Sequence, residues 1–111
     1  MSYKIVATLD FEKELKFLAK RHASLKNDLQ GLIDSLKANP NQGTSIGNNT
    51  YKIRVAITSK GRGKSGGGRV ITHVHVQAEF VLLLSIYDKS DQATITNAEI
   101  KKRIETYLKS L

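Results

Sequence analysis

The sequence predicts an α+β fold in which an N-terminal strand and a helical hairpin precede an antiparallel strand meander and a C-terminal helix (β-α-α-β-β-β-α). Two adjacent segments repeat apolar residues at helical spacing, and the later segments alternate in polarity or are continuously apolar, as strands are. The chain has 111 residues, 40% of them hydrophobic, and no cysteine. We therefore expect a single domain, residues 1–111, folded around one core without disulfide bonds.

The first half of the chain predicts the strand and the hairpin. Residues 2–9 alternate apolar and polar side chains, and Asp10 is the expected N-cap of a helix that ends near His22. Ser24 is the expected N-cap of a second helix, and Pro40 ends it because the residue before a proline avoids the helical conformation. The apolar faces of the two helices would consist of Phe11, Leu15, Leu18, Leu25, Leu29, Leu32, Ile33 and Leu36.

The second half predicts the meander and the last helix. A segment rich in glycine and asparagine leads to residues 51–58, which alternate in polarity, as residues 69–77 also do. Residues 79–87 are apolar on both faces, which predicts a central strand that is covered on both sides. A final helix begins at Thr96 or Asn97, and its apolar stripe would be Ile100, Ile104, Tyr107, Leu108 and Leu111.

The positive charge of the chain is concentrated in one stretch. The chain has 18 Lys and Arg residues against 10 Asp and Glu, a formal net charge of +8. Every charged residue between Asp34 and Glu79 is basic, and without that stretch the count is 11 basic against 10 acidic residues. An excess this local indicates a binding site for a polyanion, of which nucleic acid is the commonest. The basic residues are Lys37, Lys52, Arg54, Lys60, Arg62, Lys64 and Arg69.

The strand period groups several of these residues. Side chains alternate between the two faces of a strand, so Lys52 and Arg54 share one face of the first meander strand. The same rule places Arg69, His73 and His75 on one face of the next strand. If both faces point away from the helical hairpin, the five side chains line one concave surface of the sheet. Such a surface can bind phosphates and stabilise the charge that develops on phosphorus during phosphoryl transfer.

The loop between these two strands, residues 59–68, holds five of the eight glycines. We expect its basic residues, Lys60, Arg62 and Lys64, to lie at the rim of the surface and to bind phosphate together with the two histidines. A P-loop is excluded, because Thr58 stands where that motif needs its first glycine and a strand follows instead of a helix.

Three segments resemble the RelE/HigB-type toxins of bacterial type II toxin–antitoxin systems: residues 51–54 (YKIR), 63–71 (GKSGGGRVI) and 83–90 (LLSIYDKS). The resemblance covers nearly the whole chain, and the glycine run followed by arginine points to the HigB-like branch. It implies a RelE-like fold and a ribosome-dependent mRNA endonuclease. Such an enzyme cuts mRNA in the ribosomal A site by attack of an RNA 2′-hydroxyl on the adjacent phosphate. It also implies a cognate antitoxin that neutralises the toxin.

The resemblance further implies roles for individual residues. Lys52 and Arg54 match the family's basic strand pair, which acts on the 2′-hydroxyl or the phosphate. Arg69 matches the arginine that stabilises the transition state, and Lys89 falls where the family has a further basic residue. Tyr87 is a candidate for stacking or proton transfer, and it is equally a candidate for strand-end packing. The general acid stays open, because neither Tyr87 nor Tyr107 aligns securely with the family's C-terminal tyrosine; a histidine is the alternative.

Two other readings of the basic face remain. His73 and His75 have a spacing that strand-borne metal ligands also show, but no cysteine or nearby acidic residue completes a site, so we expect no metal and no cofactor. The ParE branch has a similar topology and inhibits DNA gyrase without cutting RNA. A ParE-like gyrase inhibitor, or a basic RNA-binding module on the same fold, is therefore the alternative function.

The expected setting of the protein follows from the same features. The N-terminus has no long apolar run and becomes charged at Asp10, unlike a signal peptide. The longest apolar run, residues 80–84, is too short to span a bilayer. We expect a soluble cytoplasmic protein whose partners are an antitoxin, the ribosome and mRNA, with no membrane association.

Overall fold

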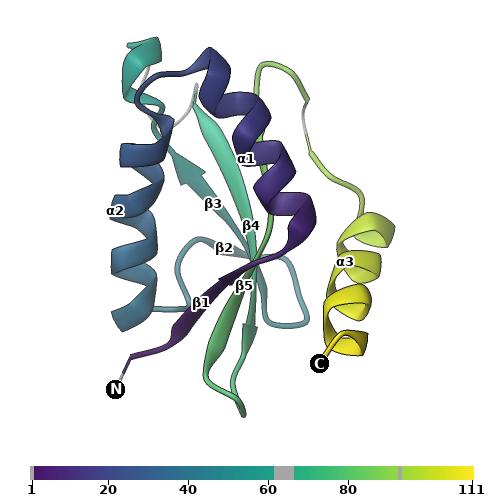
Figure 1. The fold of residues 1–111 in the computed structure, drawn as a ribbon. Coiled ribbons are helices and arrows are strands. Elements are labelled where there is room, and N and C mark those ends of the chain that lie inside the picture. The colour runs from purple at the N-terminus through teal and green to yellow at the C-terminus, as the bar shows by residue number, and fades with distance from the viewer. Residues whose placement is uncertain (1, 62–66, 93) are drawn as a thin grey trace.

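The computed structural model describes residues 2–61, 67–92 and 94–111, and in this part of the chain three α-helices pack against a five-stranded sheet (Figure 1). The order of the strands in the sheet is β1-β5-β4-β3-β2. The elements are β1 (Lys4–Ala7), α1 (Leu9–Arg21), α2 (Leu25–Ala38), β2 (Thr44–Ser45), β3 (Thr50–Val55), the 3₁₀ turn η1 (Thr58–Lys60), β4 (Gly68–His75), β5 (Phe80–Asp88) and α3 (Asn97–Lys109).

The structure confirms the predicted α+β architecture. Strands β3, β4 and β5 form the expected antiparallel meander, and β1 joins it by pairing in parallel with β5. Strand β5 therefore lies between β1 and β4, and every one of its residues is buried, as its continuous apolar sequence predicts. The two-residue strand β2, which pairs with β3, lies in the turn-rich segment and has no strand-like sequence signal.

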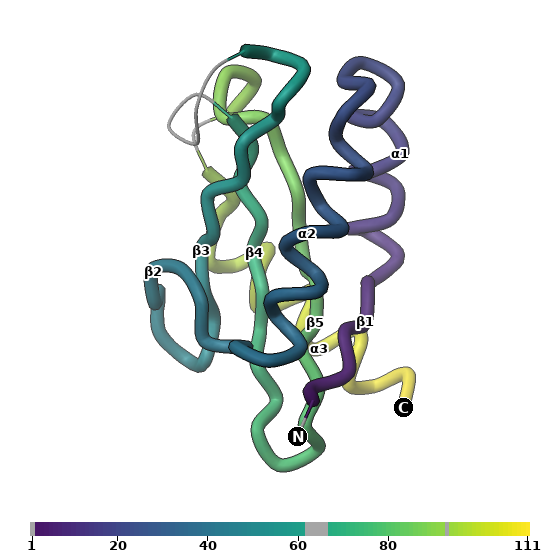
Figure 2. Tube along the Cα trace, turned by 90° about the vertical axis from the view of Figure 1, so that its left-hand side faces the viewer, coloured from purple at the N-terminus to yellow at the C-terminus, as the bar shows by residue number. Residues whose placement is uncertain are grey.

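The sheet has a different cover on each face. Helices α1 and α2 lie side by side on one face, as Figure 2 shows, and the separate core around Ile100 and Ile104 places α3 on the other. The first core contains Phe11, Leu18, Leu25, Leu29 and Leu36 of the helices with Ile53, Val70, Leu83 and Ile86 of the strands. The second core contains Ile100 and Ile104 of α3 with Ile71, Phe80, Leu82, Leu84 and Tyr87.

The start of α1 differs from the prediction. The N-cap is Thr8 and not Asp10, so Leu9 belongs to the helix instead of the strand and is 76% exposed. Thr8 outcompetes Asp10 because its buried hydroxyl makes two bonds: it accepts from the Phe11 N–H at 3.2 Å and donates to the Leu83 carbonyl at 3.0 Å. The negative charge of Asp10 in the first turn still interacts favourably with the positive end of the helix dipole.

The other predicted caps hold their positions. Thr96 is the N-cap of α3, and its side chain accepts a hydrogen bond from the Glu99 N–H. Ser24 is the N-cap residue of α2, but its hydroxyl makes no capping bond. It donates instead to Asp28 at 2.7 Å.

The outer edge of β5 is only partly covered by β1. Pairing with β1 ends at Leu83, and side chains satisfy the backbone beyond that point. Arg103 of α3 donates to the Leu84 carbonyl at 2.8 Å, and Glu14 of α1 accepts from the Ile86 N–H at 3.3 Å. Glu14 and Arg103 also pair with each other, which ties the helices on opposite faces together around this edge.

Candidate active site

The cationic residues of β3 and β4 lie on the sheet face opposite the helical hairpin. Ile53 and Val70 belong to the core beneath α1 and α2, so the residues that alternate with them point to the other side. On that side Arg54 is the direct cross-strand partner of Arg69, and Lys52 lies two residues before Arg54. The placement of these side chains by strand period is therefore confirmed.

Two like charges directly opposite each other destabilise a sheet unless something compensates for them. Arg54 is exposed, whereas Arg69 is 5% exposed and donates from Nη1 to the Gly68 carbonyl at 3.0 Å. Guanidinium groups can bind phosphate through two parallel hydrogen bonds. The arginine pair is thus a site suited to an anion.

Tyr87 lies beside this pair on β5. It is the cross-strand partner of Arg69 and is 4% exposed. Within the described residues its hydroxyl has no hydrogen-bond partner. A buried hydroxyl usually has a hydrogen-bond partner, so this one is a candidate contact for a ligand bound beside the arginine pair.

Lys60 anchors the basic loop through an ion pair with Asp88, and its binding of phosphate stays a prediction. Its Nζ lies 3.0 and 2.9 Å from the two carboxylate oxygens of Asp88 and 2.8 Å from the Ser90 hydroxyl. His22 Nε2 is 3.2 Å from the same carboxylate. Asp88 is 2% exposed; burial would raise its pKa, but the hydrogen bonds from Ser90 and Lys60 outweigh burial and hold the pKa well below its usual range.

The start of the loop is also fixed to helix α2. Asp28 accepts from the Thr58 N–H at 2.9 Å and from the Thr58 hydroxyl at 2.6 Å. Burial acts to raise the pKa of Asp28, but these bonds from Thr58 outweigh it and lower the pKa.

At the far end of the loop, Gly67 packs so closely that an added Cβ would collide with the Val55 carbonyl oxygen. The predicted phosphate-binding residues Arg62 and Lys64 lie outside the described residues.

Lys89 follows the site at the end of β5. Its side chain is exposed, and its N–H donates to the Gly67 carbonyl at 3.2 Å. It therefore lies beside the end of the loop, and its catalytic role stays a prediction.

The two histidines lie on the predicted face but away from the arginine pair. His73 is four residues from Arg69 along β4, about 13 Å at strand spacing. It is buried, and its Nδ1 lies 3.3 Å from the Thr50 hydroxyl. Burial lowers its pKa, and the neighbouring His75 lowers it further. His75 stacks on Phe80 with ring centroids 4.7 Å apart. Both side chains thus have structural contacts, and their roles in phosphate binding or proton transfer stay predictions.

Helix α3 narrows the expected cationic surface. Its apolar residues cover the part of the face formed by Ile71, Leu82 and Leu84, so the surface is not open along its full length. The segment that leads to α3 reaches the remaining part, where Lys52 Nζ donates to the Thr94 hydroxyl at 3.3 Å. The candidate site therefore consists of Lys52, Arg54, Arg69, Tyr87 and Lys89, with Asp88 supporting the loop.

Asp88 was missed by sequence reasoning, because an acidic residue after a strand reads as an ordinary turn residue. One signal was available: Asp88 ends the most apolar strand, and the chain's excess of basic residues precedes that strand. Among the described residues, no three or more His, Cys, Asp or Glu side chains cluster in a way that could hold a metal ion.

Together, the fold and this site define a small α+β protein with a cationic sheet face that is suited to phosphate. The family model described as the RelE toxin of the RelE/RelB toxin–antitoxin system matches residues 4–109. The chain therefore belongs to the RelE toxin family.

Comparison with solved structures agrees with the family. A double arginine-to-alanine mutant of the E. coli toxin RelE in the free state aligns with a TM-score of 0.66 and 21% sequence identity. The alignment covers 94% of this chain and 99% of that one, and at this identity it supports the shared fold. We found no match among curated protein sequences. No helix in the described part of the chain has the length and apolarity needed to cross a membrane.

Proposed function

We propose that this RelE-family toxin is a ribosome-dependent mRNA endonuclease that inhibits translation by cutting mRNA in the A site. The observation that carries the proposal is the cross-strand pair of Arg54 and Arg69, with Lys52 on the same face and Tyr87 beside it. A single-domain protein that acts in the cytoplasm with a cognate antitoxin, the ribosome and mRNA as partners fits this reading. The glycine run before Arg69 favours the HigB-like branch.

In the proposed reaction the 2′-oxygen of one nucleotide attacks the adjacent phosphorus, and the bond from phosphorus to the 5′-oxygen of the next nucleotide breaks. The products are a 2′,3′-cyclic phosphate and a 5′-hydroxyl. A base removes the 2′ proton, and an acid delivers one proton to the departing oxygen. Arg54 and Arg69 stabilise the added charge on the phosphoryl oxygens in the transition state.

The remaining residues supply proton transfer and positioning. Lys52 would act on the 2′-hydroxyl, and Lys89 would bind the departing side of the phosphate. The Tyr87 hydroxyl, without a partner among the described residues, is a candidate to exchange a proton at one of the two oxygens. The ribosome would orient the RNA for attack, and orientation alone contributes up to about 7–11 kcal/mol in favourable reactions. We therefore expect little cleavage of free RNA.

Primer extension on a defined mRNA in a purified translation reaction tests the proposal. We expect wild-type protein to cut within codons only when ribosomes are present, and Arg69→Ala to cut at least about 100-fold more slowly. Lys37→Ala is the matched control, because it removes an exposed charge of the same basic stretch from α2. Wild-type cleavage that Arg69→Ala leaves unchanged would contradict the role of the arginine pair.

Burial of Arg69 and Tyr87 beneath their neighbours favours the second candidate, a ParE-like gyrase inhibitor or RNA-binding module without catalysis. A supercoiling assay with DNA gyrase separates the two. Inhibited supercoiling together with intact mRNA in the translation reaction would establish the non-catalytic reading.

A further inference from the structure

The basic loop between β3 and β4 is attached at both of its ends to the same two residues, Asp88 and Lys89 at the end of β5. At the start of the loop, the Lys60 ammonium lies 3.0 and 2.9 Å from the two carboxylate oxygens of Asp88. At the other end, the Gly67 carbonyl accepts from the Lys89 N–H at 3.2 Å. Asp88 and Lys89 therefore hold the two ends of the loop together.

The carboxylate of Asp88 is the centre of this attachment. Ser90 donates to it from the N–H at 2.9 Å and from the hydroxyl at 2.6 Å, and the same hydroxyl lies 2.8 Å from the Lys60 ammonium. His22, at the end of α1, lies 3.2 Å from the carboxylate. Asp88 is buried and Lys60 is largely covered, so solvent and salt weaken this ion pair less than they would an exposed one.

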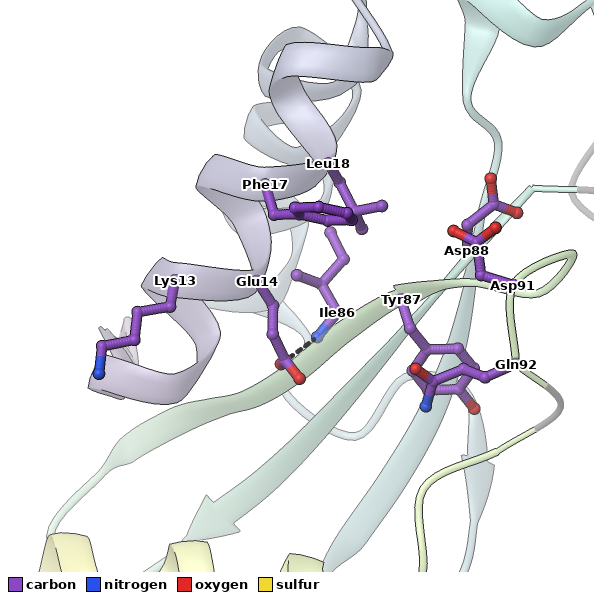
Figure 3. Close-up of a pocket in the computed structure, with 9 residues that line it drawn as sticks. All are labelled: Lys13, Glu14, Phe17, Leu18, Ile86, Tyr87, Asp88, Asp91 and Gln92. Atoms are coloured by element: carbon purple, nitrogen blue, oxygen red, sulfur yellow. Dashed lines mark hydrogen bonds between the residues drawn. The ribbon is translucent and has the colours of Figure 1, made fainter.

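Asp88 is not placed to transfer a proton at the arginine pair. Tyr87 and Asp88 are consecutive in β5, and their side chains leave the strand on opposite sides, as Figure 3 shows. Asp88 lies with Leu18 of α1, on the hairpin side of the sheet. Burial would raise its pKa, but the hydrogen bonds from Ser90 and Lys60 outweigh burial and hold the pKa well below its usual range, so the carboxylate is a weak base. Any effect of Asp88 on the site must therefore pass through the backbone.

The backbone connects Asp88 with Arg69 in one step. Gly68 is the cross-strand partner of Asp88, just as Arg69 is the partner of Tyr87. The guanidinium of Arg69 donates from Nη1 to the Gly68 carbonyl at 3.0 Å, so its position depends in part on the Gly68 peptide. Arg54 is the partner of Arg69 on the other side. A shift of the Gly68 peptide would therefore change how the two guanidinium groups face each other.

The start of β4 is held from both sides. Gly68 pairs with Val55 of β3 as well as with Asp88 of β5. The residue before it, Gly67, packs so closely on the end of β3 that an added Cβ would lie only 3.1 Å from the Ile57 nitrogen. Strand β3 thus limits movement in one direction, and the contacts of Asp88 and Lys89 limit it in the other. Loss of the Asp88 contacts would leave the Gly68 peptide held mainly from the side of β3.

We propose that Asp88 is a positioning residue for RNA cleavage, which together with Lys60 fixes the start of β4 so that Arg69 and Arg54 face one phosphoryl group. Position matters at a reacting centre, because a displacement of about 1 Å can slow a reaction by about 100-fold. Asp88 then contributes to the rate of cleavage in addition to the stability of the fold. This inference rests on the proposed nuclease function.

The test is single-turnover cleavage in the purified translation reaction, with increasing toxin in excess over the ribosome–mRNA complex. The plateau rate at saturating toxin describes the bound complex, whereas a smaller folded fraction changes only the toxin concentration that gives half of the plateau. We expect Asp88→Asn, which keeps the Lys60 charge, to lower the plateau rate roughly tenfold or more. Asp91→Asn removes the same charge from an exposed ion pair with Arg21 in the same turn and should keep the wild-type plateau.

Two further variants separate positioning from stability. Leu36→Val, in the core beneath α2, is the control for stability alone and should leave the plateau rate unchanged. Ser90→Ala removes one hydroxyl from the cluster and gives the answer if Asp88→Asn does not fold; we expect its plateau rate to fall about threefold. Thermal unfolding of every variant establishes that it is folded at the temperature of the assay.

The possible failures are distinguishable. If wild type cuts and Asp88→Asn and Ser90→Ala keep its plateau rate, the positioning role is overturned and the nuclease function stands. A higher plateau for Asp88→Asn overturns it as well, because it would show that the Lys60 ammonium acts better once it is released. Equal losses for Asp88→Asn and Asp91→Asn would assign the effect to the charge of the turn instead of the Lys60 pair, which also contradicts the inference. If wild type cuts no codon, the proposed function fails and the positioning role fails with it.

Discussion

Asp88 is the shared partner of the Lys60 and His22 side chains near the site. It is 2% exposed and holds the Lys60 ammonium, whose side chain is itself only 16% exposed. Asp88→Asn would leave that ammonium buried without a countercharge. We expect this substitution to lower the free energy of unfolding by about 2–3 kcal/mol, measured by urea denaturation. Asp91→Asn breaks an exposed pair with Arg21 and is the control, with an expected loss of about 0.5 kcal/mol.

The stabilisation by Asp88 has a defined pH dependence. Its pKa is lowered in the folded state, so the contribution is fully present above the unfolded-state pKa of about 4 and is lost as the pH falls below that value. Urea midpoints measured from neutral pH down through this range should fall less steeply for Asp88→Asn than for wild type. Parallel acid profiles for the two proteins would mean that other carboxylates carry the acid sensitivity.

The elements differ in how far the sequence could predict them. The helices and the meander follow from local periodicity, so their existence and order are confirmed. The parallel pairing of β1 with β5 depends on contacts between residues about 75 positions apart, and no local pattern records it. The start of α1 was misplaced because Thr8 and Asp10 are both good N-caps. Only the buried bond from the Thr8 hydroxyl to Leu83 decides between them.

Local sequence patterns likewise could not predict where α3 packs, and the contacts of Arg103 help to explain its position. Its guanidinium donates to Glu14 at 2.9 Å, to Glu99 at 2.8 Å and to the Leu84 carbonyl at 2.8 Å. Only two residues of α3, Ile100 and Ile104, are buried hydrophobics. The contacts of Arg103 therefore add to this apolar packing in holding the helix on the sheet.

Arg103→Met should loosen α3 while leaving the sheet intact. The substitution keeps the aliphatic stem but leaves Glu14 and the Leu84 carbonyl without their donor, at a cost on the order of 2 kcal/mol. Hydrogen–deuterium exchange should show faster exchange along α3 and unchanged protection in β4 and β5. The neighbouring substitution Lys102→Met, at an exposed position, is the control. Equal protection of α3 in both variants would show that apolar packing alone holds the helix.

At the scale of the whole molecule, the two faces of the sheet have different roles. One face buries the hairpin core, and the other carries α3 on one part and the arginine pair on the rest. The strand period was sufficient to place Lys52, Arg54 and Arg69 together, because alternation is a local property. It was not sufficient to show that His73 is buried or that Lys60 is neutralised by Asp88, because both facts depend on elements distant in sequence.

The basic side chains that give the net charge of +8 should contribute to RNA binding only where they contact phosphate. For single-stranded RNA, each phosphate contact contributes about 0.7 to the slope of log K against log salt. We therefore expect Arg54→Ala to reduce that slope by about this amount between roughly 50 and 200 mM salt. The slope is measured by fluorescence anisotropy with a labelled single-stranded RNA. Lys37→Ala removes the same formal charge from the exposed surface of α2 and should leave the slope unchanged. Equal reductions in the two variants would show that net charge, and not the arginine pair, determines RNA affinity.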